Sequence, residues 1–336
     1  MDDAASTSDL TPREVPERTI PVPTTVSPQL QRSIAAAARL PRDLMLRSPQ
    51  NDREWAGFVA GANAVSLERM AAARAMFPAQ IAEREVGGVL VRQVIPASLD
   101  PANDGRVLIH LHGGAYVING GESGLTEAIL GAHHARTRVL SVDYRMPPAA
   151  PFPAAVEDAV AVYKGVIRNT DPSRVGVFGT SAGAGLLLAM VLKLKALGLA
   201  LPGALAPSTP WADLAGESDS YATNAHIDGV LPYYEGVLEA CARIYAGESG
   251  LHDPLVSPVH GDFAGFPPSI LTTGTRDILL SDTVRVYRAM RAAGVEARLE
   301  VHEALSHAEY SSAFDSPESA VVFSDIAAFF DAHLAR

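Results

Sequence analysis

The chain has 336 residues, of which 48% are hydrophobic and 19% are charged, and its formal net charge is −11. This length suits one large α/β domain with an additional segment, and the hydrophobic fraction is ordinary for a globular enzyme. The negative charge disfavours nucleic acids and anionic membrane surfaces as partners. Cys241 is the only cysteine, so the chain cannot form an intrachain disulfide.

The N-terminal segment shows no targeting pattern. It begins Met1-Asp2-Asp3, without a basic stretch or an apolar core, so we do not expect it to act as a secretory signal. No apolar run reaches the roughly 18 residues that a membrane span requires. We therefore expect a soluble, cytoplasmic protein.

The first expected elements are an irregular arm and two helices. Residues 1 to about 27 are rich in Pro, Thr and Ser and predict the arm. Ser27 and Pro28 then have the residue types of a helix N-cap and first helical position, and apolar residues follow at helical spacing. A second helix is expected at about 52–76, before a first strand near 86–94.

From there, short β-prone runs alternate with longer helical runs. This alternation predicts a mostly parallel sheet with helices on both faces. The pattern breaks at 211–250, where a polar stretch precedes a helical one at 231–245. The remaining expected strands are 107–111, 138–142, 174–178, 203–207, 269–273 and 297–302, and the expected helices are 153–168, 182–197, 282–293 and 317–334.

Residues 179–183 read Gly-Thr-Ser-Ala-Gly and lie between a β-prone run and a helical run. A serine with small residues on both sides fits a sharp strand-to-helix turn that exposes its hydroxyl at a helix N-terminus. The pattern makes Ser181 a candidate nucleophile. Because it also fits an ordinary loop, its weight depends on the features that accompany it.

Residues 112–114 read His-Gly-Gly and directly follow an expected buried strand. Two glycines there allow the backbone to approach a ligand closely with its N–H groups. Such donors stabilise the negative charge of a tetrahedral intermediate. We expect the N–H groups of Gly113 and Gly114, together with that of Ala182, to form an oxyanion hole. A tight turn that merely ends the strand is the alternative.

Asp277 and His307 are the candidate acid and base. Asp277 follows the expected strand 269–273, at the carboxyl end where open α/β sheets gather functional groups. His307 follows the last expected strand. The chain order Ser, Asp, His accompanies this serine motif in hydrolases. Asp282 is the alternative acid, although its position at an expected helix start favours an exposed structural role.

These motifs together resemble those of the hormone-sensitive-lipase-like (bacterial family IV) esterases, a group of α/β-hydrolases. Thr180 resembles the Gly-Thr-Ser-Ala-Gly branch of that group. Three departures are Ala115, where a third glycine is usual, residues 144–149, which read Tyr-Arg-Met-Pro-Pro-Ala and lack the usual glutamate, and residues 308–309, which read Ala-Glu instead of Gly-Phe. The matching segments are 112–114, 143–145, 151–158, 179–183, 257–258 and 267–268, with Asp277 and His307.

The resemblance implies an α/β-hydrolase fold with a helical cap over the site. On this basis we expect an N-terminal arm with cap helices at 1–60, the first part of the core at 61–210, a cap insertion at 211–250 and the second part of the core at 251–336. The polar residues beside the motifs are expected to support the site. We interpret His112 as shaping its loop, and Asp143 and Arg145 as a buried pair.

The resemblance also implies a serine carboxylesterase acting on short- to medium-chain acyl esters. Ser181 would be the nucleophile, His307 the base and Asp277 the acid, with no cofactor and no metal. An amidase, a lactonase or a deacetylase would use the same triad, and a ligand-binding relative without catalysis is a further alternative. The expected partner is a small ester, and the sequence leaves open whether the chain is a monomer or a homodimer.

Overall fold

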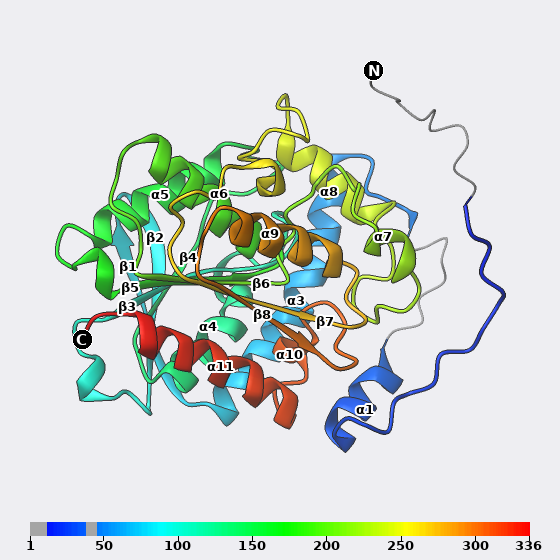
Figure 1. Ribbon diagram of the computed structural model, residues 1–336, viewed down its shortest axis with the longest axis horizontal. Coiled ribbons are helices and arrows are strands. Elements are labelled where there is room, and N and C mark those ends of the chain that lie inside the picture. Colours follow the sequence, from blue (N-terminus) through cyan, green and yellow to red (C-terminus); the bar gives the residue numbers. More distant parts are fainter. Residues whose placement is uncertain (1–11, 38–45) are drawn as a thin grey trace.

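The computed structural model describes residues 12–37 and 46–336. A single eight-stranded sheet crosses the molecule, with helices on both faces (Figure 1). The strand order is β1-β2-β4-β3-β5-β6-β7-β8. β2 is antiparallel to β1 and β4, and the other neighbouring strands are parallel. The expected α/β class with a mostly parallel sheet is confirmed.

Six of the expected strands, from residue 107 onward, correspond to β3 through β8. The single strand expected at 86–94 is wrong, because the chain forms a hairpin there. Gly87 and Gly88 make its turn with φ of 66° and 84°, values that favour glycine and suit a two-residue hairpin loop. The strands are β1 (Ala79–Val86), β2 (Val89–Pro96), β3 (Val107–Leu111), β4 (Val139–Val142), β5 (Val175–Thr180), β6 (Ala204–Ser208), β7 (Ser269–Gly274) and β8 (Ala297–His302).

The expected helices are also present, with some differences. A helix at 125–135 and two short helices at 220–223 and 309–312 were not expected, and the one expected from 231 begins only at Val237. The boundary expected at residue 60 falls inside one continuous helix. The helices are α1 (Pro28–Ala36), α3 (Asp52–Met76), α4 (Leu125–Ala135), α5 (Ala154–Val166), α6 (Ala182–Ala196), α7 (Ser220–Thr223), α8 (Val237–Ala246), α9 (Leu280–Ala292), α10 (Glu309–Ser312) and α11 (Pro317–His333).

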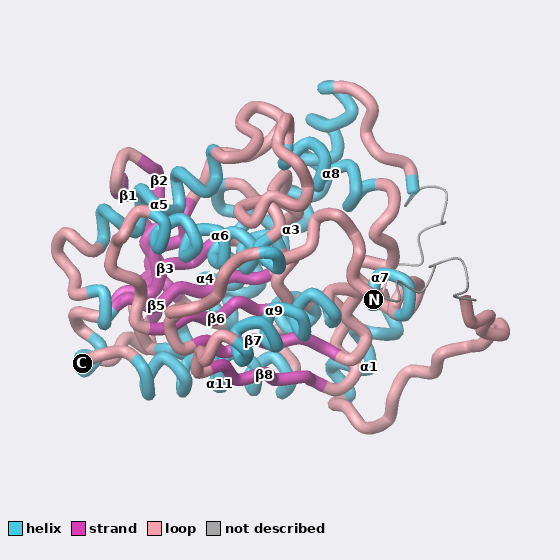
Figure 2. The backbone as a smooth tube through the Cα atoms, turned by 45° about the horizontal axis from the view of Figure 1, so that its top comes forward, coloured by secondary structure: helices cyan, strands magenta, loops and turns pink. Residues whose placement is uncertain are grey.

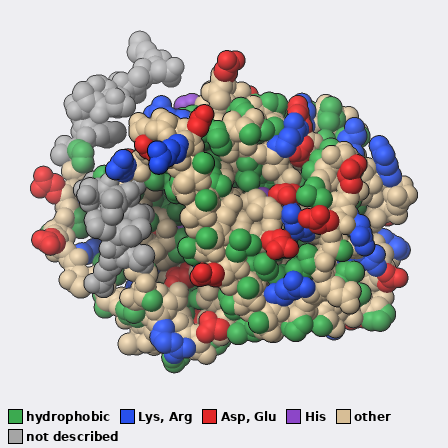
Figure 3. Space-filling view, turned by 180° about the vertical axis from the view of Figure 1, so that it is seen from behind, with side chains coloured by type: hydrophobic (Ala, Val, Ile, Leu, Met, Phe, Trp, Pro, Cys, Tyr) green, Lys and Arg blue, Asp and Glu red, His purple; other side chains and the backbone are tan. Residues whose placement is uncertain are grey.

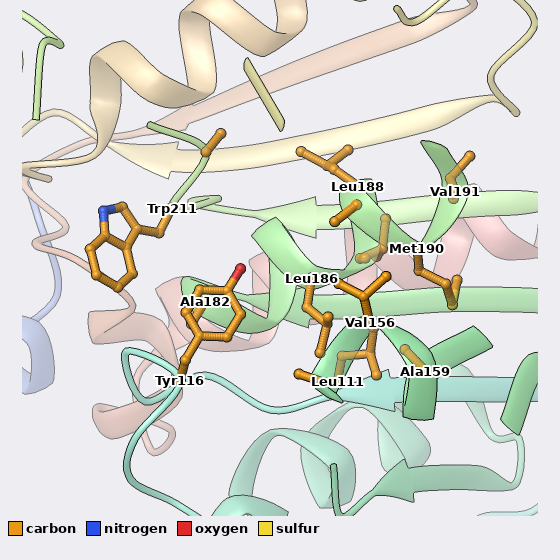
Figure 4. Packing of buried hydrophobic residues seen from close by; sticks show 14 of the residues in the cluster. Leu111, Tyr116, Val156, Ala159, Ala182, Leu186, Leu188, Met190, Val191 and Trp211 are labelled. Atoms are coloured by element: carbon orange, nitrogen blue, oxygen red, sulfur yellow. The ribbon is translucent and has the colours of Figure 1, made fainter. Parts of the chain in front are cut away.

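Two apolar cores hold the helices against the sheet. One includes buried residues of α5, α6 and α9, among them Val156, Leu186 and Met190, packed beside Leu111 of the sheet (Figure 4). The other joins α4 and α11 to the opposite face, and Leu30 of α1 is buried in it. Figure 2 shows the strands enclosed between these layers. This arrangement leaves the carboxyl ends of the strands for connecting loops.

Two segments outside the sheet reach those loops. In α3, Asn63 Oδ1 accepts a hydrogen bond of 2.7 Å from the N–H of Asn119, in the loop that follows β3. In the 211–250 insertion, α7 lies beside α9, and Ser220 Oγ donates to the carbonyl of Ile278 at 2.6 Å (Figure 1). The division into core and cap remains a prediction, although both segments contact the sheet edge that carries the motifs.

The charged side chains are distributed over the surface, and the described helices lack the character of membrane spans. Acidic and basic side chains are interspersed with apolar ones on the face seen in Figure 3. Among the residues with a described position, no helix combines the length and the apolar character needed to cross a membrane.

The contact between α6 and β3 generates a first prediction. A Cβ atom on Gly183 would lie 2.0 Å from the carbonyl oxygen of Leu111 and 2.6 Å from that of His112. We expect Gly183→Ala to lower the free energy of unfolding by about 1–3 kcal/mol or more, because both neighbours are backbone. Urea denaturation measures it.

Gly57→Ala, in the middle of α3, is the matched control, since nothing lies within 4 Å of its added Cβ. It should raise the free energy of unfolding by about 0.5–1 kcal/mol, because alanine restricts the unfolded chain. Equal stabilities for the two variants would contradict the close approach of α6 to β3.

Candidate active site

Ser181 lies at the turn between β5 and α6. Its φ of 60° and ψ of −125° are rare for a residue with a side chain, and such strain is concentrated at functional sites. The flanking glycines explain how the turn fits, since a Cβ on Gly179 would lie 2.4 Å from the carbonyl oxygen of Leu111. The small residues of the motif therefore allow this turn to press against β3.

Main-chain hydrogen bonds fix the strained turn. The N–H of Ser181 donates to the carbonyl of Ser208 at 3.1 Å. The Ser181 carbonyl accepts from Gly185 N at 2.9 Å and from Trp211 N at 3.0 Å. The candidate nucleophile is thus held between its own helix and the segment that follows β6. Its hydroxyl forms no hydrogen bond with any residue that the structure describes.

The loop after β3 passes alongside this turn. A Cβ on Gly113 would lie 2.9 Å from the Thr180 carbonyl oxygen and 3.4 Å from Ser181 Cβ. The N–H groups of Gly113, Gly114 and Ala182 have no acceptor among residues 12–37 and 46–336. Ala182 is the first residue of α6, where N–H groups have no partner within the helix. The unpaired donors of Gly113 and Ala182 therefore lie next to Ser181, and that of Gly114 follows directly in the loop.

His112, which precedes these glycines, is buried and stacked on Tyr144 with 4.2 Å between ring centroids. Burial lowers the pKa of its imidazole to about 4, so the ring is neutral at neutral pH. Its Nδ1 lies 2.9 Å from the Gly113 carbonyl oxygen and must carry the proton in order to donate there. The ring shapes the glycine loop, in agreement with the sequence-based interpretation.

Asp277 and His307 are in direct contact. His307 Nδ1 lies 3.1 Å from Asp277 Oδ1, and the two residues are 4% and 0% exposed. Asp277 also accepts hydrogen bonds of 2.8 Å from the Leu279 N–H and from the Thr273 hydroxyl. The structure thus brings together the expected acid and base, at the ends of β7 and β8.

Sequence reasoning missed a residue that completes this contact. Thr209 directly follows β6 and is fully buried. Its hydroxyl donates to Asp277 Oδ2 and lies 3.0 Å from His307 Nδ1. The available signal was its position at the carboxyl end of a strand, the same position that marked Asp277.

These surroundings set the charges of the pair. Burial alone would lower the pKa of His307, but the charge and hydrogen bond of Asp277 raise it above the usual 6.5, with help from Asp228 and Asp282. Burial alone would raise the pKa of Asp277, yet the His307 charge, with hydrogen bonds from His307 and Thr209, holds it below 3.8. His307 is therefore more basic than a free imidazole.

The alternative acid, Asp282, serves a different part of the structure. Its Oδ2 accepts from Ala212 N at 2.9 Å, Asp213 N at 2.8 Å and the Tyr221 hydroxyl at 3.2 Å. The expected exposure at a helix start is wrong, because the segment after β6 covers the first turn of α9. Burial raises the pKa of this carboxyl to about 7. No hydrogen bond among the described residues joins it to His307.

Comparisons with known proteins agree with this geometry. A family model described as the alpha/beta hydrolase fold matches residues 108–311. That range contains Ser181, Asp277, His307 and the glycine loop. This chain belongs to the α/β-hydrolases.

Individual relatives define the group more closely. An acetyl-hydrolase of Streptomyces hygroscopicus is 38% identical over 207 residues, 61% of this chain and 68% of that protein. The putative acetyl-hydrolase LipR of Mycobacterium tuberculosis is 30% identical over 82% of this chain and 88% of its own. The crystal structure of an esterase called E25 superposes with a TM-score of 0.93 at 38% identity, covering 96% of this chain and 99% of that one.

A crystal structure of an esterase from the bacterial hormone-sensitive lipase family gives a TM-score of 0.79 at 29% identity, over 92% of this chain and 99% of that one. These likenesses bear out the resemblance read from the motifs, and the chain is a hormone-sensitive-lipase-like α/β-hydrolase. Its assignment to the Gly-Thr-Ser-Ala-Gly branch remains a prediction.

This α/β-hydrolase has a cavity of about 460 Å³ between α3 and the loops after β3 and β4. Its wall includes Val117, whose N–H donates to the Gly114 carbonyl at 2.9 Å, so the cavity adjoins the glycine loop. Most of the lining is apolar. The lining residues are Asp52, Ala56, Val59, Ala60, Val117, Met146, Pro147 and Pro148.

The pairing expected between Asp143 and Arg145 is wrong. Asp143 forms an ion pair of 2.7 Å with Arg92 on β2, whereas Arg145 binds Asp158 of α5 at 2.8 Å. Arg92 reaches Asp143 because it pairs in register with Ser141 on the neighbouring strand β4. The segment after β4 is thus bonded to β2 through Asp143 and to α5 through Arg145.

One group of described residues has the composition of a metal site. Glu217, His252 and His260 have ligand atoms within 4.8 Å of one another, and all three are exposed. His252 Nε2 lies 2.8 Å from Glu217 Oε1, although 35 positions separate them in sequence. Sequence spacing does not reveal this group, because folding brings together residues that are far apart in the chain. The group includes none of the triad candidates.

Proposed function

We propose that this α/β-hydrolase cleaves short- to medium-chain carboxylic esters through an acyl-enzyme formed on Ser181. Its membership of an esterase group supports the reaction class, carboxylic ester hydrolysis. The observation that carries the mechanism is the 3.1 Å contact between His307 and Asp277, at the sheet edge where Ser181 also lies. Hydrolysis of p-nitrophenyl acetate by the full chain is the direct test.

Attack on the ester needs a base, because a serine hydroxyl is a weak nucleophile at neutral pH. His307 takes the proton of Ser181 through Nε2, since Nδ1 is bound to Asp277. Asp277 keeps the ring in that tautomer and stabilises the imidazolium that forms. The hydrogen bond between serine and histidine often tightens only in the substrate complex, so its absence here is compatible with this role.

The tetrahedral intermediate carries its negative charge on the former carbonyl oxygen. The N–H groups of Gly113, Gly114 and Ala182 are unpaired within the described chain, and Gly113 and Ala182 lie beside Ser181, so these three are the proposed donors. Loss of one such donor typically raises the activation barrier by about 3–4 kcal/mol. His307 then protonates the leaving alcohol, and water, activated by the same residue, hydrolyses the acyl-enzyme.

The proposed acyl group is small. A cavity of about 460 Å³ with a mostly apolar wall adjoins the glycine loop through Val117, although Ser181, Asp277 and His307 do not line it. Two relatives carry the name acetyl-hydrolase, which supports short acyl chains for this chain as well. A panel of p-nitrophenyl esters of increasing chain length measures the preference.

The alternatives differ in substrate or in turnover. An amidase, lactonase or deacetylase would share the same apparatus, and p-nitroanilides, lactones and acetylated sugars in parallel assays separate these activities from simple ester hydrolysis. A ligand-binding relative would bind esters without a burst of p-nitrophenol. The retained Ser181, Asp277 and His307 favour the enzyme.

Ser181→Ala should reduce kcat/KM for p-nitrophenyl acetate by about 10⁴-fold or more, because the nucleophile is lost. Alanine fits the turn, so the thermal midpoint measured by circular dichroism should stay near that of the wild type. Activity within about tenfold of the wild type would contradict the assignment of the nucleophile.

The pH profile should report the ionisation of His307. Only the neutral ring is a base, so kcat/KM should fall as the pH drops through its pKa. The charges of Asp277, Asp228 and Asp282 outweigh burial and raise that pKa, so the midpoint of the acidic limb should lie above 6.5. A rate that is constant between about pH 5 and 8 would contradict a histidine base. The thermal midpoint over the same range is the control.

Two variants distinguish the acids. Asp277→Asn should lower kcat by about 10⁴-fold, because the amide favours the wrong histidine tautomer. Asp282→Asn should leave kcat within about tenfold, since an amide oxygen can still accept from its three donors and a carboxyl with a pKa of about 7 tolerates a neutral replacement. The reverse pattern would make Asp282 the triad acid.

A further inference from the structure

Asp228 is a buried carboxylate that none of the steps above uses. It lies in the insertion between α7 and α8 and is 2% exposed. One oxygen, Oδ1, accepts from Val230 N at 2.8 Å and from Leu231 N at 2.9 Å. The other, Oδ2, accepts from Ile278 N at 2.8 Å and from His307 N at 3.1 Å. Four backbone N–H groups thus converge on one side chain.

The two donors to Oδ2 come from the loops that carry the candidate acid and base. Ile278 is the residue after Asp277, and His307 is the candidate base itself. A single oxygen of Asp228 therefore joins the loop after β7 to the loop after β8. Its second oxygen binds backbone N–H groups of the insertion itself. The side chain links three segments that are far apart in sequence.

Two neighbouring hydrogen bonds also join the insertion to the loops after β7 and β8. Gly229 N donates to Ser306 Oγ at 3.0 Å, next to His307. Asn224 Nδ2 donates to the carbonyl of Asp277 at 2.8 Å. The insertion is docked onto both catalytic loops, and Asp228 is its buried charged contact with them.

Asp228 also has an electrostatic effect. No Lys or Arg within the described chain forms an ion pair with it. Burial and the charge of Asp277 raise its pKa. The four backbone N–H groups that it binds favour the ionised form, because a carboxylate has acceptors only. The charged groups that act on His307 are then Asp277 after β7, Asp228 in the insertion and Asp282 in α9, and each favours the imidazolium form.

We propose that Asp228 is a positioning residue of this hydrolase, which fixes His307 relative to Asp277 and places a buried carboxylate against the loop of the base. Its kinetic consequence rests on the proposed ester hydrolysis. Its effect on the basicity of His307 is independent of turnover. The insertion is accordingly part of the apparatus that orients the base, in addition to lying over the sheet edge.

Asp228→Asn tests this, because it removes the charge and keeps one acceptor oxygen. The pKa of His307 is followed by the proton resonance of its Cε1–H, which is identified by its loss in His307→Ala. That pKa should be lower in Asp228→Asn than in the wild type, since a negative charge near the imidazolium is gone. The acidic limb of kcat/KM should move to lower pH by the same amount.

The rate should change as well. We expect kcat for p-nitrophenyl acetate to fall by about 10–100-fold through misplacement of the base, with KM within about twofold of the wild type. Asp219→Asn is the matched control, because Asp219 lies in the same insertion, at the N-cap position of α7, with an exposed side chain that makes no capping hydrogen bond. It should change neither the His307 pKa nor kcat.

A wild-type His307 pKa in Asp228→Asn would overturn the proposal, even if the thermal midpoint fell, because a purely structural role predicts that result. If Asp228→Asn does not fold, Asp228→Ser replaces it, since a hydroxyl still accepts a hydrogen bond without the charge. If the wild type does not hydrolyse esters, the proposed function fails, but the resonance measurement still decides the effect of Asp228 on His307.

Discussion

The site depends on the close approach of the β5–α6 turn to the backbone of β3. Any side chain at Gly179 or Gly183 would overlap the Leu111 carbonyl oxygen, at 2.4 Å and 2.0 Å respectively. This approach brings the Gly113 loop beside Ser181 and leaves its N–H groups unpaired there. The strained φ of Ser181 is the local cost of the arrangement, and it is held by backbone hydrogen bonds on both sides of the residue.

Sheet order explains why the remaining groups meet. The strands β3, β5, β6, β7 and β8 are consecutive neighbours and parallel, so their carboxyl ends share one edge. Each contributes one component at its end: the glycine loop, Ser181, Thr209, Asp277 and His307. Because these five strands keep the same relative order along the chain and across the sheet, the chain order of these residues becomes their order across the sheet.

This regularity sets how much the sequence could reveal. Ser181, Asp277 and His307 were predicted because each follows a recognisable strand, whereas the function of Thr209 depends on β6 lying beside β7. The Thr209 N–H bonded to Thr272 at 2.6 Å records that adjacency. Asp228 lies in an insertion without periodic signal, so only folding reveals its partners. The burial of Asp282 likewise depends on a neighbouring segment, which helix-start chemistry cannot foresee.

The loop that carries His307, the proposed base, is bonded from outside the sheet by the insertion and by α1. Asp228 and the insertion bind the His307 loop on one side. On the other, Ser33 of α1 donates to Glu309 Oε1 at 2.7 Å, and Glu309 Oε2 accepts from Ser306 N at 3.0 Å. Glu309 is one of the departures from the family pattern, and here it is a buried link from α1 to the base loop. The loop that carries His307, at the end of an edge strand, is thus bonded to two segments outside the sheet, so a displacement of either segment would move this loop.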